Sequence, residues 1–188
     1  TQLYPVLAAR FMRESGLRGN LFHNYDSGGY LIWHLQPNVK TCIDGRAEPF
    51  PIGMIKEHWR IFSADSDPHG FMEKYGMDLA LIDFDDRGLL KYFKGRPQWA
   101  LCHIGERTAL FVKRTDAQAS FIEQYEIPPP EKSGAAKARL VFPPPGETAK
   151  IFPYTSSEIL AARRGAILEE LGYPGGWALP VTNTDGHP

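Results

Sequence analysis

Hydrophobic and polar positions follow two different periods along the first two thirds of the chain. Apolar residues recur at helical spacing in several segments, which predicts helices at residues 3–15, 30–35, 52–62 and 71–75 and another after Asp86. Short apolar runs between and after them predict strands at residues 20–25, 40–44, 78–84, 99–104 and 108–112. The run Leu79–Ile82 is the clearest strand, because an uninterrupted apolar run is typical of a strand that is covered on both faces.

Strands that alternate with helices indicate parallel crossover units. The last two predicted strands flank Gly105–Glu106, a turn signal that favours an antiparallel hairpin. We therefore expect an α/β fold with three layers. Its mostly parallel sheet would have the flavodoxin-like strand order 2-1-3-4-5 and would end in an antiparallel C-terminal hairpin.

The composition changes near residue 127, where two proline triplets bracket a stretch rich in Lys, Ala and Gly. Such a stretch is typical of an extended connector. Farther on, Thr155–Glu158 matches a capping box and precedes an apolar stripe that ends at Leu171. We expect an α/β domain at residues 1–115, a helix and Pro-rich connector at 116–154, a C-terminal helix at 155–173 that packs on the domain or a partner, and a flexible tail at 174–188.

Composition narrows the possible partners. The formal net charge of −1 gives no electrostatic reason to expect nucleic acid, and the apolar stretches are too short to span a bilayer. The chain begins with Thr1 rather than Met, which suggests a fragment or a processed product. Cys42 and Cys102 lie in apolar runs, so we expect buried free thiols, with a disulfide as the alternative. No cofactor-binding motif or Cys/His metal spacing is present, so no cofactor and no metal are predicted.

Polar side chains follow each of the first three predicted strands. Because the carboxyl ends of parallel strands share one edge of the sheet, where ligands usually bind, these side chains should gather there. The set comprises His23, Asn24, Tyr25 and Asp26 after the first strand, Asp44, Arg46 and Glu48 after the second, and Asp83, Asp85 and Asp86 after the third.

Two interpretations of this edge involve a ligand. In the first, Gly28 and Gly29 open a helix whose backbone N–H groups face an anion, and Arg46 adds a fork of donors, although Asp26 would repel the anion. In the second, Asp26, Asp44 and Asp83 converge as oxygen ligands for Mg²⁺ or Ca²⁺.

The third interpretation is structural, and we favour it. Asp26 and Ser27 would cap the helix, while Gly28 and Gly29 would allow it to pack closely against the sheet. Asp44 and Arg46 would form a fixed ion pair that holds the turn after the second strand.

Other residues give weaker signals. The histidines are scattered, so each is expected to face solvent or to make a single hydrogen bond. Trp33 and Trp59 occupy helical positions at which core packing is more common than a stacking platform for a sugar. No recognisable set of nucleophile and base is present, and no catalytic residue is predicted.

Three segments carry a resemblance to a known family: GNLFHNY at residues 19–25, GGYLIW at 28–33 and CIDGRA at 42–47. With the flanking residues 3–114, they resemble the soluble C-terminal extracytoplasmic domain of bacterial glycosyltransferase-like polytopic membrane proteins. A more distant likeness is to the outward-facing domain of the oligosaccharyltransferase catalytic subunit. There an aromatic-Asp-Tyr-Gly motif precedes a helix and helps hold the acceptor peptide, and Tyr25–Gly28 occupies the comparable place without the tandem tryptophans.

The resemblance implies a non-catalytic domain at the extracytoplasmic, periplasmic face of the bacterial inner membrane, where it positions a substrate or a partner. Its partners would be the membrane-embedded remainder of the same polypeptide and a glycan or peptide acceptor. The candidate ligand-binding residues are Tyr25, Asp26, Gly28, Gly29, Asp44 and Arg46. One alternative is a small stand-alone enzyme or nucleotide- or metal-binding α/β protein that uses the Asp26/Asp44/Asp83 edge, and another is a protein-interaction module.

Overall fold

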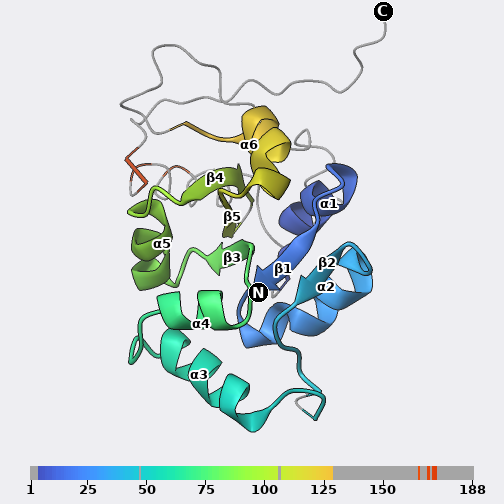
Figure 1. The fold of residues 1–188 in the computed structure, drawn as a ribbon, viewed down its shortest axis with the longest axis vertical. Coiled ribbons are helices and arrows are strands. Elements are labelled where there is room, and N and C mark those ends of the chain that lie inside the picture. Colours follow the sequence, from blue (N-terminus) through green and yellow to red (C-terminus); the bar gives the residue numbers. More distant parts are fainter. Residues whose placement is uncertain are drawn as a thin grey trace, which may run out of the picture.

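Five strands form one open mixed sheet in the computed structural model, which describes residues 4–46, 48–105 and 107–128 together with Gly165, Glu169, Leu171 and Gly172. The predicted α/β fold is therefore confirmed (Figure 1). The strands are β1 (Gly19–Phe22), β2 (Val39–Thr41), β3 (Leu79–Asp83), β4 (Trp99–Ile104) and β5 (Thr108–Lys113), and their spatial order is β2-β1-β3-β5-β4.

This order differs from the predicted 2-1-3-4-5 at its last two positions. The parallel part, β2-β1-β3, agrees with the prediction, and β4 and β5 form the expected antiparallel hairpin. However, β5 rather than β4 lies beside β3, and the two run antiparallel over five residue pairs. Each of these strands is buried except for one partly covered residue, Leu101 in β4 and Lys113 in β5, so apolar character along the strand does not decide which of the two takes the interior position.

Helices cover both faces of the sheet and complete the three layers (Figure 1). α1 (Val6–Glu14), α2 (Gly28–Leu35) and α6 (Ala119–Tyr125) pack on one face, and α3 (Ile52–Phe62), α4 (His69–Lys74) and α5 (Arg87–Lys94) pack on the other. α1 ends where predicted, because Gly16 has the left-handed φ of +67° that closes a helix C-terminus. None of the helices described combines the length and the apolar character that crossing a membrane requires.

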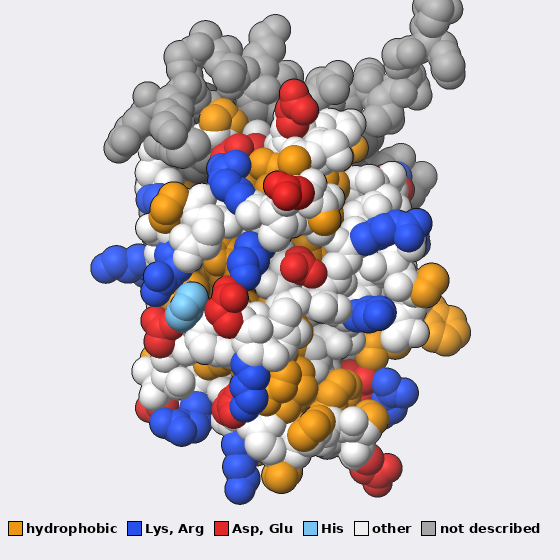
Figure 2. All heavy atoms as spheres, in the orientation of Figure 1, with side chains coloured by type: hydrophobic (Ala, Val, Ile, Leu, Met, Phe, Trp, Pro, Cys, Tyr) orange, Lys and Arg blue, Asp and Glu red, His pale blue; other side chains and the backbone are white. Residues whose placement is uncertain are grey.

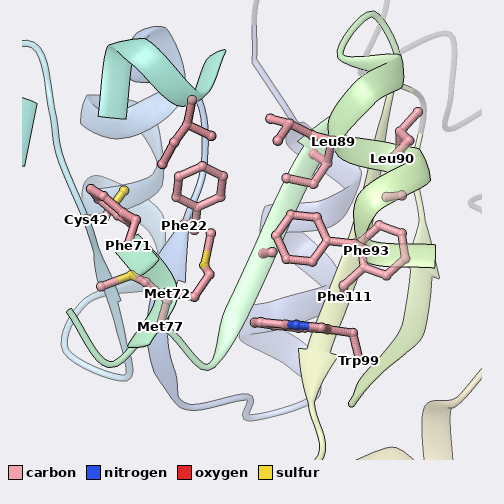
Figure 3. Close-up of a cluster of buried hydrophobic side chains, with 14 of the residues drawn as sticks. Phe22, Cys42, Phe71, Met72, Met77, Leu89, Leu90, Phe93, Trp99 and Phe111 are labelled. Atoms are coloured by element: carbon pink, nitrogen blue, oxygen red, sulfur yellow. The ribbon is translucent and has the colours of Figure 1, made fainter. Parts of the chain in front are cut away.

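The core under α3, α4 and α5 is rich in aromatic rings. Phe93 of α5 makes an edge contact with Trp99 at 4.9 Å between ring centroids and stacks on Phe111 at 5.5 Å. Farther along the sheet, Phe22 and Phe71 also make an edge contact, with 5.6 Å between their ring centroids (Figure 3). We call this set of buried side chains the first core cluster; the second core cluster lies on the other face under α1, α2 and α6.

The two cysteines belong to different clusters. Cys42 is buried in the first and Cys102 in the second, and both are free thiols, as predicted. Burial raises the pKa of each thiol to about 12, so neither is a reactive thiolate near neutral pH.

The outer edge of β4 is met by the segment that follows α6. The backbone N–H of Ile127 donates to the carbonyl of Leu101 at 2.7 Å, and the Ile127 side chain is buried in the first core cluster. The opposite edge of the sheet is β2, a strand of only three residues.

The predicted boundaries after residue 115 are only partly within the described residues. The predicted helix after residue 115 is present as α6. The Pro-rich connector beyond residue 128 and the tail lie outside the described residues. Of the predicted C-terminal helix, Gly165 and Glu169 are helical and exposed, while Leu171 is 2% exposed and packs in the first core cluster.

This burial predicts that Leu171 contributes to the stability of the whole domain. Leu171→Ala should lower the free energy of unfolding by about 2–5 kcal/mol, because truncating a buried leucine removes apolar contacts and leaves a cavity. Glu169→Ala, on an exposed position two residues away, should change it by less than about 0.5 kcal/mol. Urea denaturation of the two variants measures both values, and equal, small effects would contradict docking of this segment.

Candidate functional site

The carboxyl edge of the parallel strands holds the candidate site. β1 is followed by His23, Asn24, the 3₁₀ helix η1 (Tyr25–Ser27) and α2, and β2 is followed by residues 42–46. Because β1 and β2 pair in parallel, these two segments leave the sheet side by side. The site is therefore built from the same residues that carry the sequence resemblance.

Gly28 fixes how α2 sits on the sheet. A Cβ at this position would lie 2.3 Å from the Ile43 carbonyl oxygen and 2.7 Å from the Asp44 Cα, so only glycine fits. Around Gly29, by contrast, nothing lies within 4 Å of the corresponding point. The prediction of close packing is thus confirmed for Gly28 and wrong for Gly29.

The helix start is capped by a different residue from the predicted ones. Asn24 Oδ1 accepts the backbone N–H of Ser27 at 3.0 Å, whereas the Ser27 side chain makes no capping bond and Asp26 is exposed. The cap moves to Asn24 because η1 precedes α2 and shifts the first free N–H groups toward the strand. The N–H of Gly28 donates to the Tyr25 carbonyl. These two backbone donors are used within the turn, which weakens the anion-binding interpretation.

Asp44 and Arg46 form the predicted ion pair. Asp44 is 1% exposed and accepts from Arg46 three times: from the backbone N–H at 2.9 Å, from Nε at 2.9 Å and from Nη2 at 2.5 Å. The hydrogen bonds from the Arg46 side chain lower the pKa of Asp44 below its usual value. The carboxylate is therefore charged and held in place, and most of the Arg46 side chain faces solvent.

Asp83 is engaged elsewhere along the edge. It pairs with Arg107 from the hairpin, whose Nε donates to Asp83 Oδ2 at 2.6 Å. Nearby, the pKa of Asp86 is raised to about 6, mainly by burial and to a lesser degree by the negative charges of Asp83 and Asp85. Within the part of the chain that the structure describes, no three His, Cys, Asp or Glu side chains are grouped to hold a metal ion. Asp26, Asp44 and Asp83 therefore do not converge as the metal interpretation requires.

Two histidines lie buried beneath this edge, which their scattered spacing in the sequence did not predict. His58 of α3 donates from Nε2 to the His23 carbonyl at 2.7 Å, and His23 donates from Nδ1 to the Asn24 carbonyl at 2.6 Å. Their other ring nitrogens are buried without a partner among the described residues. Burial lowers the pKa of both, and that of His23 falls to about 4, so both rings are neutral. The hydrogen bond from His58 to the His23 carbonyl connects the turn after β1 to α3.

Trp33 and Trp59 are exposed, so their predicted place in the core is wrong. Trp59 is 55% exposed and meets Tyr25 edge to face at 6.3 Å between ring centroids, and Trp33 of α2 is 85% exposed. α3 buries a stripe formed by Met54, Ile55, His58 and Ile61, and this stripe leaves Ile52 and Trp59 outside. Figure 2 shows hydrophobic side chains gathered at this end of the molecule, over α3 and the segment that leads into it.

Comparisons with protein-family models, with curated proteins and with solved structures give no match for this chain. The functional inference therefore depends on the chemistry of the edge itself. That edge combines a rigid turn, a fixed carboxylate–guanidinium pair and an aromatic contact between the partly buried Tyr25 and the exposed Trp59.

The contrast between the two glycines gives a direct test of the α2 contact. Gly28→Ala should destabilise the domain by about 1–3 kcal/mol or more, because the new methyl group meets backbone atoms that cannot move aside. Gly29→Ala should be neutral or stabilising by up to about 1 kcal/mol, since it adds a helix-favouring residue in open space. Chemical denaturation of the two variants decides this, and comparable destabilisation by both would contradict the packing described.

A third buried histidine, His103, predicts a loss of stability in mild acid. Its ring stacks on Phe11 at 4.4 Å, and burial alone lowers its pKa from 6.5 to about 3. Below pH 6.5 the unfolded chain therefore binds a proton that the folded chain does not. Above pH 6.5 the burial of His103 leaves the free energy of unfolding unchanged. As the pH falls below 6.5 it lowers this free energy, by roughly 3 kcal/mol at pH 4.5.

Urea denaturation near pH 7 and pH 4.5 of the wild type and of His103→Phe measures this contribution. The variant should lose less stability between the two pH values than the wild type does. Asp86 acts in the opposite direction, since its raised pKa of about 6 stabilises the fold as the pH falls, but it is present in both proteins. An equal loss in both would show that His103 does not carry the effect.

Proposed function

We propose that this chain is the extracytoplasmic domain of a glycosyltransferase-like bacterial membrane protein, and that it positions a substrate or partner without carrying out the transfer itself. The sequence segments that resemble this family form the carboxyl edge, where Gly28, Asp44 and Arg46 make specific contacts with one another's backbone or side chains. The contacts give these residues a physical reason to occur together.

The exposed ring of Trp59, in contact with the partly buried Tyr25, is the observation that carries the proposal. Large aromatic rings that remain exposed on a rigid surface mark a contact site for a ligand or partner. Their flat faces suit the C–H faces of a sugar ring, and the solvent-facing guanidinium of Arg46 adds hydrogen-bond donors on the same edge of the sheet. We therefore favour a glycan as the ligand, with a peptide acceptor as the alternative.

The polar groups at this edge support positioning rather than chemistry. A general base must reach the proton that it removes from a substrate within hydrogen-bond distance. His23 and His58 are buried, and the carboxylates of Asp44 and Asp83 are held by Arg46 and Arg107. These buried or paired groups stabilise the turn, while Trp59, the solvent-facing side of Arg46 and Asp26 are the parts of the edge that a ligand can touch.

A protein-interaction module is the second candidate. The exposed Trp33 favours it, together with Tyr4, which is 43% exposed and stacks on Tyr30 of α2 at 5.0 Å. Such a surface on α2 is suited to contact another polypeptide, including the membrane-embedded remainder of the same chain.

Titration with maltotetraose, followed by nuclear magnetic resonance of the tryptophan indole N–H groups, tests the glycan proposal. The Trp59 signal should shift, and Trp59→Ala should weaken binding about tenfold, the equivalent of roughly 1.4 kcal/mol. Trp33→Ala is the matched control, because it removes an even more exposed indole from a different helix and should leave binding unchanged.

Two results would contradict the proposal. Equal losses of affinity in Trp59→Ala and Trp33→Ala would mean nonspecific contact of the saccharide with exposed rings. A Trp59 indole signal that does not shift during the titration would exclude a glycan at this site. The membrane context is tested separately by the gene sequence upstream of the codon for Thr1, together with protease accessibility of this domain in spheroplasts.

A further inference from the structure

A groove with a volume of about 500 Å³ lies at the opposite, amino-terminal edge of the sheet. It is formed between the end of α1, the residues that lead into β1 and β3, and the start and outer face of α6. Figure 1 shows α6 beside α1 at the end of the sheet where β1 begins. The volume is typical of sites for small ligands, which occupy about 300–1,000 Å³.

The unpredicted position of β5 creates this groove. Because β5 lies beside β3 and runs antiparallel to it, the chain returns to the amino edge next to Asp78, whose carbonyl accepts the Lys113 N–H at 2.8 Å. The following residues, from Thr115 to Gln118, therefore lie against the turn that precedes β1. In the predicted order β5 would have returned at the outer edge of the sheet, away from β1.

Two polar side chains of the groove are held in place by hydrogen bonds. Gln118 is 8% exposed, and its Nε2 donates to the Arg18 carbonyl at 2.7 Å. Asp78 accepts the Asn20 N–H through Oδ2 at 3.4 Å, and its other oxygen can accept from a ligand. Gly19, with φ +145°, permits this approach, because a Cβ there would lie 3.3 Å from Asp78 Oδ2.

α6 contributes an aromatic stripe next to a polar one. Phe121 and Tyr125 are one helical turn apart with ring centroids at 4.8 Å, and both make edge contacts with Phe11 of α1, at 6.2 Å and 5.2 Å. Ser120 and Gln124 lie one position earlier in each turn and are exposed. The groove therefore presents hydroxyl and amide groups beside rings that are fixed by packing.

We propose that this groove binds an uncharged saccharide. A sugar offers hydroxyl groups that both donate and accept, which the carboxylate of Asp78 and the amides of Gln118 and Gln124 can satisfy, and it offers C–H faces for Phe121 and Tyr125. The acidic and the basic side chain that line the groove, Asp78 and Arg18, carry opposite charges, so the groove offers no net charge to attract an ionised ligand. An extended peptide is disfavoured because the groove lies at strand ends, where no strand edge is open for pairing.

This inference does not rest on the function proposed above, since the two sites share no residue. Maltotetraose and chitotetraose serve as uncharged probes, and backbone amide shifts of residues 115–125 are the readout. We expect saturable shifts there with one or both probes. Gln124→Ala and Ser120→Ala should each weaken binding by about threefold to tenfold, and Asp78→Asn by about tenfold.

Glu123→Ala is the matched control, because Glu123 is exposed on the same helix but does not line the groove, and it should leave the affinity unchanged. Trp59→Ala should also leave it unchanged. The proposal is overturned if neither probe shifts these amides at millimolar concentration, or if Glu123→Ala weakens binding as much as Gln124→Ala. Loss of all binding in Trp59→Ala would likewise assign the saccharide to the carboxyl edge alone.

Discussion

The antiparallel ladder between β3 and β5 organises both ends of this domain. It runs from Leu79 opposite Val112 to Asp83 opposite Thr108, and backbone bonds extend it past both strands. At one end it brings Arg107 to the buried Asp83, and at the other it brings the start of α6 to Asp78. Two chemically different edges therefore depend on one strand pairing, and any sequence change that shifted its register would alter both.

Local signals were sufficient to predict much of the fold. α3 has the predicted bounds, and the parallel order β2-β1-β3 follows from strands that alternate with helices. The position of β5 could not be predicted in this way, because Trp99–Ile104 and Thr108–Lys113 are both apolar runs of similar length. Either strand of a hairpin can pair with β3, and which one does so depends on burial against helices that are distant in sequence.

The same distinction applies to the candidate site. Asp44 and Arg46 are two residues apart, so their pairing could be anticipated from neighbouring residues. Two adjacent glycines at a helix start indicated close packing, but not that Gly28 alone meets Ile43 and Asp44. The contact of His58 with His23 spans 35 positions. The exposure of Trp59 depends on which side of α3 faces the core. Met54, His58 and Ile61 recur at helical spacing and are buried, and apolar residues on the side that includes Trp59 recur at helical spacing too. Tertiary packing decides between such stripes.

Both outer strands of the sheet carry a feature that opposes pairing with another sheet. β2 has only three residues and places Lys40 in solvent at its centre, and a charged side chain in the middle of a short edge strand opposes pairing with a second chain. On the other side, Ile127 already occupies the Leu101 carbonyl of β4. Copies of this domain held close together would therefore be protected against edge-to-edge association, although the aromatic surfaces remain free to make contacts.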